Sequence, residues 1–101
     1  MKLVRDKIPD IIKKDGKECV YHVANYNEYK FRLYEKLREE IDEFINTPCK
    51  EEAGDIYEVF VTILRLHEID FSDVVFAAHD KKRSKGGFFE KIILEDTNEY
   101  R

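Results

Sequence analysis

The stretch LREEIDEFINTPCKEEAGDI, residues 37–56, decides how this 101-residue chain folds. Its centre, Asn46-Thr47-Pro48, interrupts a helical pattern. Thr is a favoured N-cap residue and Pro is favoured in the first turn of a helix. We therefore expect one helix to end near Ile45 and a second to begin with Thr47 as its N-cap. A short break between two helices predicts an antiparallel helix hairpin.

Four carboxylates lie at mirrored positions on either side of this break. Glu40 and Asp55 are equally distant from its centre, and the same holds for the pair Glu43 and Glu52. Two carboxylates three residues apart share a helix face, about 4.5 Å apart along the axis. The hairpin is therefore expected to gather all four at one helix–helix seam. They repel one another unless a cation neutralises them, and oxygen ligands suit Mg²⁺, Mn²⁺ or Ca²⁺. The alternative for either pair alone is a solvated helix face.

Two further observations predict the rest of the fold. Helical patterns with cap residues occur on both sides of the hairpin, and the first of them has Pro9 in its first turn. Two segments rich in β-branched and aromatic residues, Glu18–Ala24 and Phe88–Leu94, predict short strands that pair with each other. The expected fold class is therefore mainly α, a small helical bundle built on the hairpin with a minor two-stranded β element. We expect a single domain over residues 1–101. The expected helices are 8–14, one from a cap at Asn25 or Asn27 to about 45, one from Pro48 to about His67 with Thr47 as N-cap, and one from Ser72 as N-cap to about Arg83.

The helix after the break is apolar on most of its surface. Its apolar residues include Ile56, Tyr57, Val59, Phe60, Val61, Ile63, Leu64 and Leu66. A helix that is apolar nearly all round must be buried nearly all round, and a chain of this length has few other helices to cover it. We therefore expect a homodimer or a higher homo-oligomer. The alternative is that this helix is the central helix of a monomer.

Charge and composition exclude several classes of partner. The net charge of −4 argues against a nucleic-acid partner, because such proteins usually carry a basic excess. Residues 35–58 hold nine acidic and three basic side chains, whereas residues 79–91 hold five basic and two acidic ones. No apolar run approaches the length of a membrane span, and the first ten residues have no signal-peptide pattern. With Cys19 and Cys49 expected as free thiols, the cytoplasm is the expected location.

These motifs resemble a known family. EExxE at residues 39–43, followed by ExxD at residues 52–55, is similar to the pattern of the all-α NTP pyrophosphohydrolases, which include MazG, dimeric dUTPases and phosphoribosyl-ATP pyrophosphohydrolase. Residues 3–12, LVRDKIPDII, resemble the LVRDKIPEII opening of a small MazG-like, phosphoribosyl-ATP-pyrophosphohydrolase-like group. Residues 82–88, KRSKGGF, resemble the basic K-R-x-x-GGF segment of that group. The resemblance spans about residues 3–95.

The resemblance implies Mg²⁺-dependent hydrolysis of a nucleoside triphosphate, or a related nucleotide, to the monophosphate and pyrophosphate, with removal of unwanted nucleotides as its purpose. Glu39 is then the residue that orients or deprotonates the attacking water, with a surface role as its alternative. The implied metal ligands are Glu40, Glu43, Glu52 and Asp55. The expected phosphate ligands are Arg5, Lys7, Lys82, Arg83 and Lys85. The alternatives for these cations are favourable placement at a helix C-terminus and, for Arg5 and Lys7, a salt-bridge tether of the N-terminus.

Gly54 departs from the family pattern, in which a larger residue is more usual inside ExxD. Because glycine destabilises a helix interior, Gly54 predicts close packing at that position or an altered activity. Three alternatives to the main interpretation stay open. They are hydrolysis of phosphoribosyl-ATP in histidine synthesis, a non-catalytic helical dimer that binds a metal or a partner, and a sensor that binds a nucleotide without cleaving it.

Overall fold

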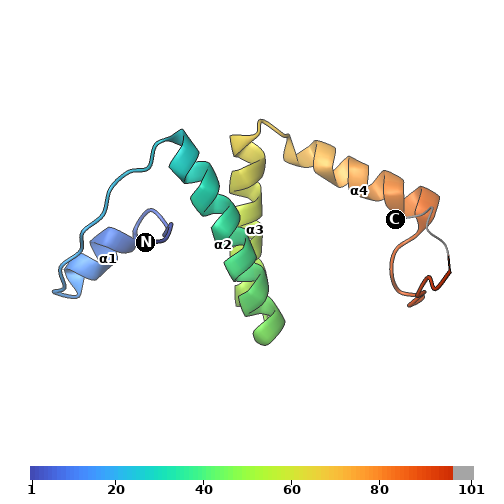
Figure 1. Ribbon diagram of the computed structural model, residues 1–101, viewed down its shortest axis with the longest axis horizontal. Coiled ribbons are helices and arrows are strands. Elements are labelled where there is room, and N and C mark those ends of the chain that lie inside the picture. Colours follow the sequence, from blue (N-terminus) through green and yellow to red (C-terminus); the bar gives the residue numbers. More distant parts are fainter. Residues whose placement is uncertain (97–101) are drawn as a thin grey trace. The chain divides into compact units, whose positions relative to one another are not determined.

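The computed structural model describes residues 1–96 and is mainly helical, which confirms the expected class (Figure 1). The helices of this part of the chain are α1 (Ile8–Lys14), α2 (Tyr26–Asn46), α3 (Lys50–Leu66) and α4 (Phe71–Lys85). They fall into two compact units, of which the first is Met1–Ile69 and the second begins at Asp70. The single domain over residues 1–101 stays a prediction. Among residues 1–96, no helix combines the length and the apolar character that a membrane crossing requires.

α2 and α3 pack side by side as the predicted antiparallel hairpin (Figure 1). The N-cap of α2 is Asn25, whose side chain accepts a hydrogen bond from the Glu28 amide at 3.0 Å. At the other end, the Thr47 amide donates to the Glu43 carbonyl at 2.9 Å, so Thr47 closes α2. The N-cap of α3 is Cys49. The predicted Thr47 cap is wrong because the Thr47 backbone already belongs to the end of the preceding helix.

α1 forms where the sequence predicts it. Pro9 lies in its first turn, where the missing N–H of proline costs no helical hydrogen bond. The Ile8 amide donates to the Arg5 carbonyl at 3.1 Å, which ties the N-terminal segment to the start of the helix. The helix ends before Asp15, and Gly16 follows at φ 77°, a left-handed conformation that glycine adopts without strain. The chain then runs through residues 17–25 to α2.

Neither predicted strand is present among residues 1–96. Residues 18–24 connect α1 to α2 irregularly, and residues 88–94 follow α4 without regular structure. Val20 is 101% exposed and Phe88 is 98% exposed. A strand needs a neighbouring strand to pair its N–H and C=O groups, and none of the described backbone hydrogen bonds involves residues 18–24. The prediction is wrong because β-branched and aromatic composition without such a neighbour does not make a strand.

The hydrophobic core of the first unit is small. Of the apolar side chains in residues 1–96, only Leu33 on α2 and Ile63 and Leu64 on α3 are buried. On the same two helices, Ile45 is 68% exposed and Phe60 is 36% exposed. The apolar surface predicted for α3 is thus covered only in part by α2, and the expected second subunit stays a prediction.

The second unit is built on α4. Its N-cap is Asp70, which accepts hydrogen bonds at one carboxylate oxygen from the amide and the hydroxyl of Ser72, at 3.0 and 2.8 Å. These bonds lower the pKa of Asp70, because they favour the ionised carboxylate. The predicted cap, Ser72, is therefore a first-turn residue held by the true cap two positions earlier. The helix ends at Lys85, before Gly86 at φ 85°.

Both cysteines are free thiols, as the sequence predicts. Cys19 lies in the connection between α1 and α2, and Cys49 lies in the turn of the hairpin. Each is half-buried.

Candidate functional site

Three carboxylates converge at the seam of the hairpin. Glu40 of α2 and Glu52 and Asp55 of α3 each offer one oxygen, and these oxygens lie within 4.8 Å of one another. Ligand oxygens that share one Mg²⁺ or Ca²⁺ are at most about 4–5 Å apart, because each lies about 2.0–2.6 Å from the ion. The spacing of the three side chains, called the acidic cluster from here on, therefore fits ligands of a single divalent cation.

Burial separates the acidic cluster from an ordinary charged surface. Glu40 is 5% exposed and is the one buried charged residue among residues 1–96. Its Oε2 atom and the Oε2 atom of Glu52 are both buried, and neither has a hydrogen-bond partner. A buried carboxylate oxygen without a partner is costly, and native structures rarely leave one unsatisfied. Two such oxygens at one seam identify a place where a cation would be strongly favoured.

The surroundings of Glu40 disfavour its ionised form. Burial is the largest cause and raises the pKa of Glu40 above its ordinary value. The hydrogen bond and charge of Lys36 act in the opposite direction, whereas the negative charges of Glu43 and Asp55 raise the pKa further. Loss of hydration, more than the neighbouring negative charges, therefore disfavours the ionised carboxylate of Glu40, and a cation bound at the seam would offset this cost.

Lys36 is a member of the site that the sequence analysis missed. Its Nζ lies 3.2 Å from Oε1 of Glu40 and 3.6 Å from Oε1 of Glu39. Burial alone lowers the pKa of Lys36, but the hydrogen bonds and charges of the two carboxylates outweigh it and raise the pKa. Lys36 precedes Glu39 by three positions and Glu40 by four on the same helix. This spacing brings side chains together on a helix face, so it could have predicted both contacts. By engaging Oε1 of Glu40, Lys36 leaves Oε2 as the oxygen without a partner.

Arg5 reaches the acidic cluster from the N-terminal segment. Its guanidinium donates to Oδ1 of Asp55 at 2.7 Å. This contact is the salt-bridge tether that stood as the alternative to phosphate binding. Arg5 and Lys36 together supply two positive charges, one at each end of the Glu40–Asp55 pair.

Two other predicted residues flank the acidic cluster. Glu43 is exposed and is not among the three converging carboxylates, although its charge acts on Glu40. Three residues turn a helix by about 300°, so Glu43 points about 60° away from Glu40. The side chain of Glu39 is 34% exposed and contacts Lys36, so it lies next to the acidic cluster with access to solvent.

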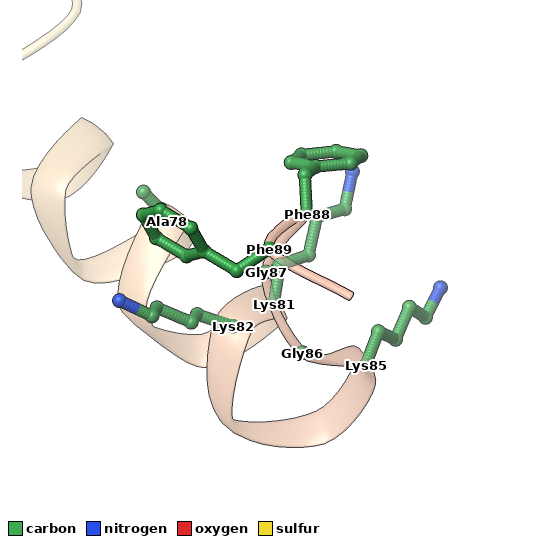
Figure 2. Close-up of a pocket in the computed structure, with 8 residues that line it drawn as sticks. All are labelled: Ala78, Lys81, Lys82, Lys85, Gly86, Gly87, Phe88 and Phe89. Atoms are coloured by element: carbon green, nitrogen blue, oxygen red, sulfur yellow. The ribbon is translucent and has the colours of Figure 1, made fainter. Parts of the chain in front are cut away.

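The other predicted phosphate ligands occupy two separate places. Lys7 is exposed and its backbone forms the N-cap of α1. The last turn of α4 holds Lys82, Arg83 and Lys85, where cations are favoured by the helix dipole, and Arg83 pairs with Asp80 at 2.5 Å. A groove follows this turn, and Lys82 and Lys85 extend in opposite directions from it (Figure 2). Its lining is Ala78, Lys81, Lys82, Lys85, Gly86, Gly87, Phe88 and Phe89.

Gly54 is not closely packed in the described structure. A Cβ atom built at this position meets no heavy atom within 4 Å, and the residue is exposed. The close packing predicted from the helix-interior glycine is therefore absent from residues 1–96, because Gly54 lies on a part of α3 that α2 does not cover.

Comparison with protein-family models, curated proteins and solved structures finds no match to this chain.

Proposed function

We propose that this chain is a Mg²⁺-dependent pyrophosphohydrolase, which cleaves a nucleoside triphosphate or a related nucleotide to the monophosphate and pyrophosphate. The observation that carries the proposal is the pair of buried, unpartnered oxygens on Glu40 and Glu52, beside Asp55. Mg²⁺ is commonly bound by a few carboxylates together with the phosphates of a substrate. The acidic cluster supplies three carboxylates for the ion, and the nearby arginine and lysine side chains supply positive charge for the phosphates.

The acidic cluster would hold the ion, with Mn²⁺ as a substitute for Mg²⁺. When bound, the ion withdraws negative charge from the phosphate oxygens and neutralises the carboxylates. Glu43 stays a predicted fourth ligand, since its charge already acts on Glu40 from the next turn of α2. Lys36 fixes one oxygen of Glu40 and keeps that side chain in place at the seam.

Glu39 is the proposed general base. Lys36 lies 3.6 Å from its Oε1 atom, which leaves Oε2 to accept a proton from water. The water oxygen attacks the α-phosphorus, the bond from that phosphorus to the bridging oxygen breaks, and pyrophosphate leaves with the electron pair. Arg5 and Lys7 are the proposed phosphate ligands of the first unit. Lys82, Arg83 and Lys85 at the end of α4 stay predicted phosphate ligands of the second unit.

We also propose that the chain works as a homodimer or a higher homo-oligomer. Three buried apolar side chains in residues 1–96 are a small core for a domain of this size. Ile45 on α2 and Phe60 on α3 expose apolar surface that a second copy would cover. A cytoplasmic location and the absence of a nucleic-acid partner remain predictions from the sequence.

One observation favours a non-catalytic alternative. Arg5 and Lys36 already neutralise part of the acidic cluster without a metal ion. A helical module that uses this seam only for structure, or only to bind a metal or nucleotide, would need no more than these contacts. Turnover that depends on Mg²⁺ separates the two functions.

The decisive experiment measures pyrophosphate release from a panel of canonical and damaged nucleoside triphosphates and phosphoribosyl-ATP, with and without Mg²⁺. We expect Mg²⁺-dependent release of pyrophosphate together with the monophosphate. Glu40→Gln removes one charged ligand and should lower kcat by on the order of 100-fold. Glu51→Gln is the matched control, because Glu51 is exposed in the first turn of α3 and lies outside the acidic cluster. Full activity in Glu40→Gln, or no release from any substrate by the folded protein, would overturn the proposal.

A further inference from the structure

The two cations at the acidic cluster are held in different ways. The Lys36 side chain is 18% exposed and contacts a Glu40 side chain that is 6% exposed, from the same helix. The Arg5 side chain is 60% exposed and contacts an Asp55 side chain that is 38% exposed. An exposed ion pair contributes little to stability, whereas a buried charge that loses its partner is costly. Arg5 can therefore leave Asp55 easily, and Lys36 cannot leave Glu40.

The position of Arg5 in the chain also permits movement. Arg5 precedes α1, in a segment without regular structure, so its displacement breaks no α2–α3 contact. The contact joins residues 50 positions apart. The Arg5 side chain can thus leave Asp55 without disturbing the helix hairpin, whereas Asp55 belongs to α3.

A cavity lies beside Arg5. Its volume is about 570 Å³, and it is lined by the N-terminal segment, the connection before α2 and the first turns of α2. This volume lies within the range of small-molecule sites, about 300–1,000 Å³. Arg32 and Tyr29 also line this cavity, together with the acidic residues Asp6 and Glu28, and Arg32 is already paired with Glu28 and Glu35. The cavity therefore gives a ligand room next to Arg5, and a phosphate there would depend on the Arg5 guanidinium itself.

We propose that Arg5 is an exchangeable cation, which neutralises Asp55 until a divalent cation binds there and then transfers to a phosphate of the incoming nucleotide. The inference rests on the proposed function, since it needs both the metal and the nucleotide. The exchange leaves no charge without a partner, because Asp55 gains the metal ion while Arg5 gains the phosphate. A guanidinium suits this second position, because its planar donors match two phosphate oxygens at once.

The exchange couples the two binding events. A nucleotide that draws Arg5 away from Asp55 removes a competitor of the metal, and a metal that takes Asp55 releases Arg5 for the nucleotide. Linkage requires both effects to have the same size, so each ligand tightens the binding of the other by one common factor. The N-terminal segment thereby favours binding of the complete metal–nucleotide pair over either ligand alone.

The test compares wild-type protein with Arg5→Gln, using Mn²⁺ as the metal probe and electron paramagnetic resonance to measure free Mn²⁺. With Mn²⁺ alone, Arg5→Gln should bind about two- to fivefold more tightly than wild type, which is the size of one exposed ion pair. Lys14→Gln is the matched control, because it removes the same charge from an exposed position on α1 and should leave the affinity unchanged.

The second arm adds a triphosphate analogue with a methylene group between the α- and β-phosphates, which is not hydrolysed. Wild-type protein should bind Mn²⁺ more tightly when the analogue is present. Arg5→Gln should bind the analogue about tenfold more weakly and should lose most of this coupling. Circular dichroism of each variant shows that the helices are intact.

The outcomes separate this inference from the proposed function. Unchanged or weaker Mn²⁺ binding in Arg5→Gln would show that Arg5 is a structural tether and would overturn the exchange. Coupling that persists in Arg5→Gln, or an analogue that does not bind to wild type, would overturn the phosphate half of the proposal. If wild type binds no Mn²⁺, both the exchange and the proposed function fail. If the exchange is observed but no nucleotide is cleaved, the exchange stands and only the catalytic proposal fails.

Discussion

Replacing Gly54 with Ala is expected to stabilise this protein. Gly54 is an interior residue of α3, and a Cβ atom built there meets no heavy atom within 4 Å, so the new methyl group causes no clash. What remains is the intrinsic helix preference, which favours Ala over Gly by about 0.5–1 kcal/mol. For a domain of about 60–100 residues, 1 kcal/mol raises Tm by about 4–8 °C, so Gly54→Ala should raise Tm by about 2–8 °C.

The assay is thermal unfolding followed by circular dichroism in the presence of EDTA, so that bound metal does not add to the stability. Ala53→Gly is the matched control at the neighbouring exposed position of the same helix, and it should lower Tm by a similar amount. A loss of stability in Gly54→Ala, with Ala53→Gly behaving as expected, would refute the reasoning. It would mean that another part of the assembly packs against Gly54, because overpacking typically costs about 1–3 kcal/mol.

Two other predictions concern the exposed apolar surface and the cap of α4. Ile45→Asp should convert the proposed oligomer to a monomer in light scattering, because it puts a charge where an apolar side chain is 68% exposed in one chain. A wild-type protein that is already monomeric would contradict this prediction. The lowered pKa of Asp70 means that its ionised form stabilises α4 above its ordinary pKa of 3.8, and that this contribution is lost as the pH falls through the lowered value. Asp70→Asn still caps the helix but does not titrate. Between about pH 5 and pH 2, the helical circular dichroism of wild type should therefore fall more steeply than that of the variant. Parallel pH profiles of the two proteins would rule the effect out.

The helix hairpin could be predicted from sequence because its signals are local. Asn25 caps α2, and a short polar break at residues 47–49 separates α2 from α3. Pro9 acts in the same local way in the first turn of α1. The exact cap was harder to predict, because several polar residues near each helix start can accept the first hydrogen bonds. Asp70 takes that role two residues before Ser72, and Thr47 is used by the end of α2. The strands failed for a different reason, since a strand depends on a neighbour that composition does not supply.

The acidic cluster was partly predictable. The mirrored spacing around the break places Glu40, Glu52 and Asp55 together, because a three-residue turn fixes the register of two helices. The sequence did not show that Arg5 and Lys36 contact the acidic cluster. The contact of Arg5 with Asp55 spans 50 positions, and no periodicity in either segment encodes such a pairing. The contact of Lys36 with Glu40 could have been predicted from their spacing of four residues on one helix. Only the structure shows that Glu40 is buried in the seam.

The hairpin also sets an order of events during folding. The three carboxylates of the acidic cluster come from two consecutive helices, so a single short loop closure brings them together, and contacts that are local in sequence form early and fast. Arg5 can reach Asp55 only after the N-terminal segment has closed a loop of about 50 residues, at a larger entropic cost. Lys36 travels with α2 and is present from the start. A chain that folds in this order would pass through a stage in which the cluster is assembled with Lys36 as its one cation. If the proposed divalent cation bound at that stage, it would favour the state in which the two helices are in register.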